Sequence, residues 1–150
     1  MLVGRIIILA SWLIAASFAL PAQSQERLVV IVSADREIEL TIEEVARIYL
    51  KQRRFWSNRE SIVAINRDAD SDLRKAFTER IFADEARRLN AYWNRQYYKG
   101  VLPPLTLASD EAVRRFVARE PNAIGYISES QLDASVRAVL FLPPSDPSPP

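Results

Sequence analysis

The sequence predicts an α/β fold in one domain, with a mostly parallel sheet flanked by about four helices. Two observations carry this prediction. Apolar, strand-like runs alternate with amphipathic, capped helices along the chain, which is typical of layered α/β proteins. The run RLVVIVS at 27–33 is apolar without interruption, as in a strand that is covered on both faces. The chain of 150 residues is long enough for one such domain, which we expect at 23–142.

The start of the domain is predicted to run from strand to helix. After the strand at 27–33, Thr41 and Glu44 form a capping box, which marks the beginning of a helix. The apolar residues of this helix recur on one face, and they are Ile42, Val45, Ile48 and Tyr49.

The stretch 61–82 has the pattern on which the function hypothesis depends. It contains an apolar strand at 62–65, a polar loop at 66–70 and an amphipathic helix that opens at Ser71. The first N–H groups of a helix have no partner within the helix and carry partial positive charge. A strand, a short polar loop and a helix start therefore favour an anion site.

The second half of the domain is predicted to contain two more helices. The third helix begins at Asp84, with Gly100 at its C-terminal cap and Pro103 blocking any continuation. Ser109 or Asp110 caps the fourth helix. The remaining strands are expected at 105–108, 123–127 and 136–142.

Both ends of the chain are expected to lie outside the folded domain. Residues 1–22 contain one basic residue, an apolar run at 6–19 and a small residue at Ala22, which is the layout of a cleaved secretory signal peptide. This layout indicates a periplasmic protein, with an uncleaved membrane anchor as the alternative. The tail at 143–150 is rich in proline and serine and is expected to be disordered.

Composition excludes several classes of function. The chain contains no Cys and no His, which excludes thiolate nucleophiles, the usual general base and typical zinc sites. One of the 20 basic residues, Arg5, lies in the expected leader, which leaves 19 basic and 19 acidic residues. A neutral domain has no net field that attracts nucleic acid. We therefore expect no catalytic residues, no cofactor, no metal and no nucleic-acid partner.

Several segments resemble one protein family. They include the pattern W-x-x-x-x-x-x-G-x-x-P-P at 93–104 and the sequence A-I-G-Y at 123–126, with further likeness at 42–56 and 62–77. In this order they resemble the short, single-domain relatives of the periplasmic phosphate-binding proteins of ABC transporters. The resemblance covers roughly 28–142 and implies a type II periplasmic-binding-protein fold, with one lobe instead of two.

The same resemblance implies a ligand loop. In that family a loop of the form R-S-D-G-S-G-T ahead of a helix holds the anion. Arg67 matches the arginine of the loop and Ser71 matches its second serine. Arg74, in the first turn of the helix, can add a cation. The other loop positions depart from the pattern, and they are Asp68, Ala69, Asp70, Asp72 and Leu73.

The candidate anion ligands are expected at the edge where the strands end and the helices begin. Arg67, Ser71 and Arg74 are the main candidates, and Ser33 and Ser109 are more distant ones. Ser71 also fits the simpler role of a helix N-cap. Arg67 also fits an ion pair with one of the aspartates that follow it.

Two other patterns point to different ligands. Asp68, Asp70, Asp72 and Glu79 have the spacing of a calcium loop, but Leu73 occupies the position that requires glycine. The basic, aromatic segment at 51–59 has the composition of a nucleic-acid patch, which the neutral charge of a secreted domain disfavours. We expect the aromatic side chains of that segment and of the third helix to pack, and these are Phe55, Trp56, Trp93, Tyr97 and Tyr98.

Two function hypotheses follow. The first is a secreted, non-catalytic module that binds phosphate or a related small oxyanion and works with a membrane permease or sensor. A homodimer would then rebuild the second side of the site. The alternative is an accessory or interaction domain of a transporter or sensor system that has lost ligand binding.

Overall fold

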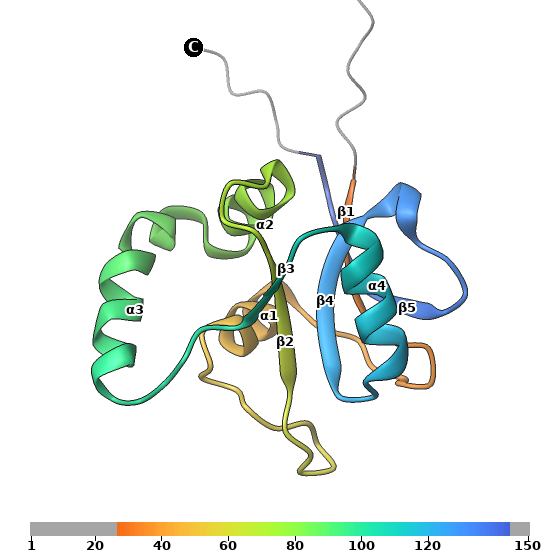
Figure 1. Ribbon diagram of the computed structural model, residues 1–150, viewed down its shortest axis with the longest axis horizontal. Coiled ribbons are helices and arrows are strands. Elements are labelled where there is room, and N and C mark those ends of the chain that lie inside the picture. The colour runs from red at the N-terminus through yellow and green to blue at the C-terminus, as the bar shows by residue number, and fades with distance from the viewer. Residues whose placement is uncertain (1–26, 145–150) are drawn as a thin grey trace, which may run out of the picture.

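The computed structural model describes residues 27–144, without the side chains of residues 84–86 (Figure 1). The predicted signal peptide lies outside the described residues, and so does nearly all of the predicted tail. The helices and strands in chain order are β1 (Leu28–Ser33), α1 (Ile42–Tyr49), β2 (Val63–Arg67), α2 (Asp72–Phe82), α3 (Leu89–Tyr98), β3 (Leu105–Leu107), α4 (Asp110–Arg119), β4 (Ala123–Ser128) and β5 (Val136–Leu142). Two short 3₁₀ helices lie at Ala83–Arg88 and Glu129–Gln131.

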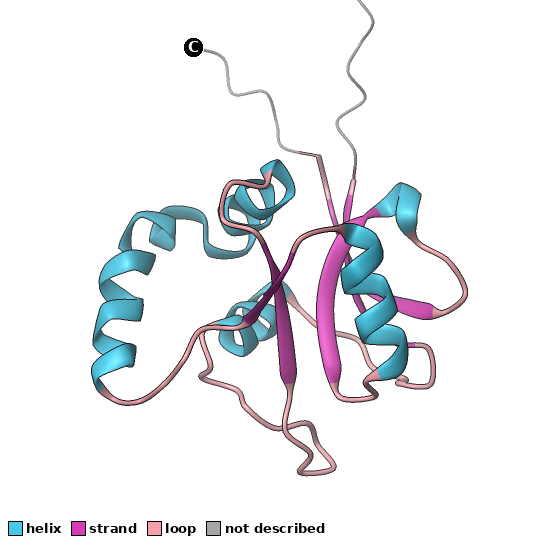
Figure 2. Cartoon of the chain, in the orientation of Figure 1, coloured by secondary structure: helices cyan, strands magenta, loops and turns pink. Residues whose placement is uncertain are grey.

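A five-stranded sheet in the order β3-β2-β4-β1-β5 forms the centre of the domain (Figure 2). β2 is parallel to both of its neighbours, β3 and β4, whereas β1 is antiparallel to β4 and to β5. Strands β2, β3, β4 and β5 therefore point the same way, and β1 runs against them. This arrangement confirms the predicted α/β fold with a mostly parallel sheet.

The direction of β1 determines which predicted site residues lie at the same end of the strands of the sheet. Ser33 ends β1 and is paired with Val136, the first residue of β5. Arg67 ends β2, which runs the opposite way. The prediction that Ser33 and Arg67 lie at the same edge of the sheet, where the strands end, is therefore wrong. A continuous apolar run in the sequence does not show in which direction its strand runs.

Alternate residues of β1 face two different halves of the hydrophobic core. Val30 lies with residues of α1 and α2 on one face of the sheet, and Ile31 lies with residues of α4 on the other. On the first face the ring of Phe77 stacks on that of Tyr126, with centroids 3.9 Å apart and planes 5° apart.

The packing of α4 on β4 requires a glycine at position 125. A Cβ atom at Gly125 would lie 2.5 Å from Cγ1 of Val113 and 3.2 Å from Cγ2 of Val117. Both valines are fully buried. The glycine of the A-I-G-Y sequence thus lets the helix approach the strand at a distance that a side chain would block.

Helix caps follow the sequence closely. The predicted capping box is present, with the backbone N–H of Glu44 donating to Thr41 Oγ1 at 3.2 Å and that of Thr41 to Glu44 Oε2 at 3.0 Å. The backbone N–H of Ala112 donates to Ser109 Oγ at 3.1 Å, so Ser109 is the N-cap of α4.

The region around α3 differs most from the prediction. A 3₁₀ helix replaces the first turns of the predicted helix, so α3 begins at Leu89 and not at Asp84. Gly100 ends the helix as predicted, with a φ of 75° and its N–H donating to the carbonyl oxygen of Tyr97 at 2.9 Å. No residue of α3 is buried. The prediction that Tyr97 and Tyr98 pack is wrong, because both side chains are exposed.

Of the aromatic residues in the loop after α1, one packs as predicted and one does not. Trp56 is buried and donates from its indole nitrogen to the carbonyl oxygen of Asn122 at 3.1 Å. Phe55 is exposed, so its predicted anchoring role is wrong.

Candidate functional site

The candidate site is built around the side chain of Arg67, at the end of β2. Its Nη2 donates to the carbonyl oxygen of Ala108 at 3.0 Å, and its Nη1 pairs with the carboxylate of Asp110. Its Nε is buried and has no hydrogen-bond partner among the described residues. The guanidinium is therefore held in place through its two Nη atoms, and its Nε–H has no partner among the described residues.

Asp110 connects the ion pair to two other elements. It is the first residue of α4, and its Oδ2 accepts from the backbone N–H of Ser128 at 2.9 Å, where β4 ends. The side chains of Arg67 and Asp110 are only 12% and 15% exposed. The arginine thus pairs with a carboxylate from a distant part of the chain, and the predicted alternative of a pair with one of the aspartates after it is wrong.

The first turn of α2 lies directly against Arg67. The Nη1 of Arg74 donates to the backbone carbonyl oxygen of Arg67 at 2.6 Å. The backbone N–H of Arg74 donates to Ser71 Oγ at 3.4 Å, which makes Ser71 the N-cap of α2. The structure therefore brings Arg67, Ser71 and Arg74 together, as predicted.

Ser109 lies beside the same group but is engaged elsewhere. It sits between Ala108 and Asp110, both of which contact Arg67. Its own hydroxyl oxygen caps α4. The start of α4 thus contacts the guanidinium of Arg67 and the first turn of α2 contacts its backbone carbonyl, while Ser33 lies at the opposite end of the strands.

Tyr126 fixes the backbone under the site. Its hydroxyl donates to Asn66 Oδ1 at 2.6 Å and accepts from the backbone N–H of Arg67 at 3.1 Å. Burial raises the pKa of Tyr126 to about 12, although the hydrogen bond from Arg67 and the charges of Arg74 and Arg67 act in the opposite direction. Burial likewise raises the pKa of Tyr49, whose hydroxyl donates to the carbonyl oxygen of Ile65 at 2.9 Å.

Asp110 and Tyr126 could hardly be recognised from the sequence as parts of this group. Asp110 reads as a favourable residue in the first turn of a helix, and Tyr126 reads as one more residue of an apolar strand. Their roles depend on strand order, since β4 must lie beside β2 for Tyr126 to reach the backbone of Arg67. A tyrosine in an otherwise apolar run at 123–127 is a signal that was available, because a buried hydroxyl needs a partner.

The acidic residues at the end of the loop and the start of α2, Asp70 and Asp72, are exposed to solvent. Asp72 pairs with Lys75 at 3.0 Å, and its side chain is 99% exposed. Because α2 begins at Asp72, the later positions of the calcium pattern lie on a helix and cannot wrap around an ion. Within 27–83 and 87–144, no group of three or more acidic residues is placed to hold a metal ion.

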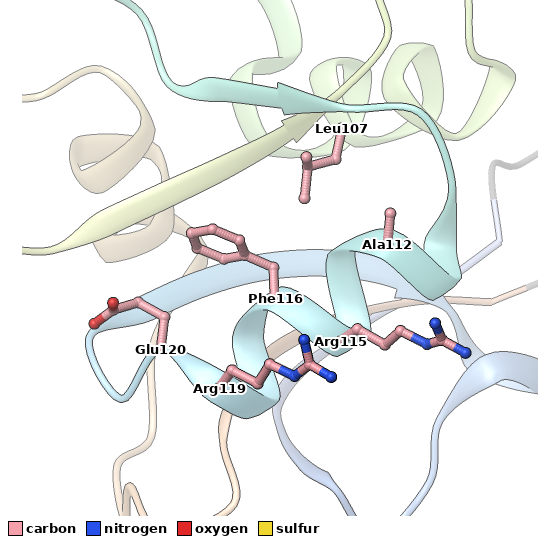
Figure 3. A pocket seen from close by; sticks show the side chains of 6 residues that line it. All are labelled: Leu107, Ala112, Arg115, Phe116, Arg119 and Glu120. Carbon is pink, nitrogen blue, oxygen red and sulfur yellow. The ribbon is translucent and has the colours of Figure 1, made fainter.

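Two pockets flank the site. One of about 30 Å³, room for about one water molecule, is bordered by Arg74, Asn66 and Trp93 among others. A larger pocket of about 410 Å³ lies between β3 and α4, and Figure 3 shows Phe116 and Leu107 reaching into it with Arg115 and Arg119 at its rim. Arg67 borders neither of these two pockets.

Among the known proteins compared with this chain, only solved structures match it. No protein-family model and no curated protein sequence matches the chain. A protein described as a phosphate ABC transporter substrate-binding protein from Clostridium perfringens, solved with bound phosphate, is similar at a TM-score of 0.62 and 25% identity; the match covers 76% of this chain and 44% of that one.

Two further solved structures give the same result. An ABC-type phosphate transport receptor from Vibrio cholerae matches at a TM-score of 0.59 and 22% identity, over 76% of this chain and 45% of that one. PstS from Borrelia burgdorferi matches at a TM-score of 0.59 and 19% identity, over 76% of this chain and 46% of that one. The chain thus spans less than half the length of each of these structures.

These matches define the class of fold. The chain is a structural relative of phosphate ABC transporter substrate-binding proteins, and its sheet and helices resemble one lobe of such a protein. The relationship inferred from the A-I-G-Y and W-to-P-P segments is confirmed. Between Arg27 and Pro144, none of the helices is long and apolar enough to cross a membrane.

Proposed function

We propose that this domain binds a small oxyanion, with phosphate as the first candidate, at the edge formed by Arg67 and the first turns of α2 and α4, and that it does so without catalysing a reaction. The observation that carries the proposal is the mostly buried guanidinium of Arg67, which lies against the start of α4 and whose Nε has no partner among the described residues. A fixed cation next to helix N-termini is a typical arrangement for anion recognition.

The local charges support an anion but limit its affinity. Arg67 and Arg74 bring two guanidinium groups to one backbone segment, and Ser71 adds a hydroxyl. The carboxylate of Asp110, however, already neutralises Arg67. An incoming oxyanion must either replace this carboxylate or bind beside it through Nε, and both routes cost electrostatic energy.

Titration calorimetry with phosphate and with sulfate tests the proposal. We expect micromolar binding of phosphate, lost in Arg67→Ala. Arg114→Ala is the matched control, because Arg114 forms a comparable ion pair with Asp133 and lies elsewhere on α4. Equal loss of binding in both variants would show that only the general charge of the domain matters.

A second pair of variants separates ligand binding from stability. Ser71→Asp keeps an N-cap for α2 but adds negative charge at the site, so it should abolish phosphate binding while the domain stays folded. Asp110→Asn keeps an acceptor for the N–H of Ser128 but frees the charge of Arg67. We expect it to bind phosphate about tenfold more tightly, equivalent to about 1.4 kcal/mol.

The ion pair between Arg67 and Asp110 also favours a second candidate function. If the carboxylate permanently occupies the cation, the domain is an accessory or interaction module of a transporter or sensor system. In that case neither the native chain nor Asp110→Asn gives heat with phosphate or sulfate. Both functions place the domain in the periplasm after removal of residues 1–22, next to a membrane permease or sensor, and light scattering with and without phosphate tests for a homodimer.

A further inference from the structure

The surface that the proposed function leaves unused is formed by α3 and the segment leading to β3. We call residues 87–105 the α3 surface. Figure 1 shows α3 at the side of the molecule, away from β4 and α4. Four large apolar side chains of this surface are exposed, by between 52% and 89%, and they are Tyr97, Tyr98, Leu102 and Leu105.

The same surface carries only positive charge. Residues 87–105 contain four basic residues and no Asp or Glu, although the whole chain has nearly equal numbers of both signs. All four are exposed. None of them forms an ion pair with a carboxylate in the described part of the chain, whereas Arg27, Arg53, Arg114 and Arg137 all do. The four are Arg87, Arg88, Arg95 and Lys99.

Three of these cations lie on one side of the helix. Arg95 and Lys99 follow Arg88 by seven and eleven residues, a spacing that returns to the same helix face. Between them, Tyr92 donates from its hydroxyl to the carbonyl oxygen of Leu50 at 2.6 Å, which fixes the helix against the end of α1. The cations are thus presented by a positioned helix.

A shallow pocket lies among these side chains. Its volume is about 150 Å³, and it is lined by Leu50, Gln52, Arg88, Leu89, Tyr92 and Arg95. Two guanidinium groups at the rim suit a phosphodiester, and the leucine and tyrosine side chains suit the apolar carbon next to it.

We propose that the α3 surface binds the face of a bilayer that contains acidic phospholipids. Exposed lysine and arginine side chains are attracted to anionic lipid headgroups, and tyrosine rings favour the boundary between headgroups and acyl chains. The exposed tyrosines and Leu102 add the apolar side chains that can enter the boundary below the headgroups. The bilayer is therefore the partner that uses both the charge and the apolar side chains of this surface.

Vesicle sedimentation tests the proposal with the chain from Gln23 to Pro150, which contains every described residue and both of the core clusters described above. We expect binding to vesicles of phosphatidylcholine mixed with phosphatidylglycerol, and none to phosphatidylcholine alone. Binding should weaken as salt is raised, because exposed charges are screened. The double variant Arg88→Gln/Arg95→Gln should lower the partition coefficient about 30-fold, from the usual contribution of each surface cation.

The matched control is Arg54→Gln/Arg119→Gln, which removes two exposed cations from other surfaces. It should leave vesicle binding within about twofold of the native chain, and so should Arg67→Ala, which separates this proposal from the oxyanion site. Equal losses in the two double variants, or equal binding to both kinds of vesicle, would overturn it. Tighter binding to a single-stranded RNA than to the acidic vesicles would also overturn it, since the surface would then recognise nucleic acid.

Discussion

Helices α3 and α4 have the same length, ten residues each, but opposite relations to the sheet. α4 has a serine N-cap and buries Val113 and Val117. α3 has no side-chain cap and buries none of its residues, and two of its tyrosines point to water. Both segments show apolar residues at helical spacing, so periodicity alone does not tell a core helix from a surface helix.

The difference between the two helices has a physical basis. Valine side chains are short and branched, and against Gly125 they allow α4 to lie close to β4. The tyrosines of α3 are long and carry hydroxyl groups, which suit a partly solvated boundary better than a core that excludes water. Changes on the sheet side should therefore alter stability, whereas changes on α3 should alter surface interactions.

The largest effect is expected from the tyrosines on the sheet side at alkaline pH. The pKa of Tyr126 is raised to about 12 from an ordinary value near 10, so the folded state favours the neutral phenol. This contribution, roughly 3 kcal/mol, is fully present below about pH 10 and is lost as the pH rises through about 12. The raised pKa of Tyr49 acts in the same direction.

Urea unfolding at about pH 8 and about pH 11 measures this effect. The free energy of unfolding of the native chain should fall from the lower to the higher pH, and that of Tyr126→Phe should fall by less. Tyr98→Phe on α3 is the control and should behave like the native chain. A pH dependence unchanged by Tyr126→Phe would contradict the assignment.

The next largest effect is expected at Gly125. An alanine there places its Cβ against Val113 and should lower the free energy of unfolding by about 1–3 kcal/mol, by overpacking. Gly125→Ala combined with Val113→Ala should recover part of this loss, which thermal unfolding can measure. Gly100→Ala, at the end of α3, has open space around its Cβ but a φ of 75°, so it should cost about 1–2 kcal/mol that no change at Val113 recovers.

Much of the fold could be predicted from the sequence, because strands, caps and proline or glycine breaks are local signals. Thr41, Ser71 and Ser109 were all recognisable as helix N-caps, and Gly100 as a helix end. The direction of β1 could not be predicted, because it depends on which strands pair, and this misplaced Ser33.

The candidate site could be predicted only in its local part. Arg67, Ser71 and Arg74 lie within one strand-loop-helix segment, so their proximity follows from chain connectivity. The partners Asp110 and Tyr126 come from elements 43 and 59 residues away from Arg67 in the sequence, and they reach it only through the order of strands in the sheet. The role of Arg67 and its neighbours as anion ligands stays a prediction.

A smaller effect is expected at the cap of α4. Ser109→Ala removes the acceptor for the N–H of Ala112 and should cost about 1 kcal/mol, measured by urea unfolding. Ser109→Asp keeps the acceptor and should cost much less. If Ser109→Ala leaves stability unchanged but weakens phosphate binding, the hydroxyl acts on the ligand and not on the helix.

The smallest effect on stability is expected on α3 itself. Tyr97→Ser and Tyr98→Ser should each change the free energy of unfolding by less than about 0.5 kcal/mol, because both side chains are mostly exposed, by 68% and 89%. Val117→Ala on α4 is the matched core change and should cost clearly more, since it opens a cavity at a fully buried position. A loss above about 1 kcal/mol in either tyrosine variant would mean that α3 packs on the domain in solution, and the α3 surface would then lack the exposed aromatic side chains on which bilayer binding depends.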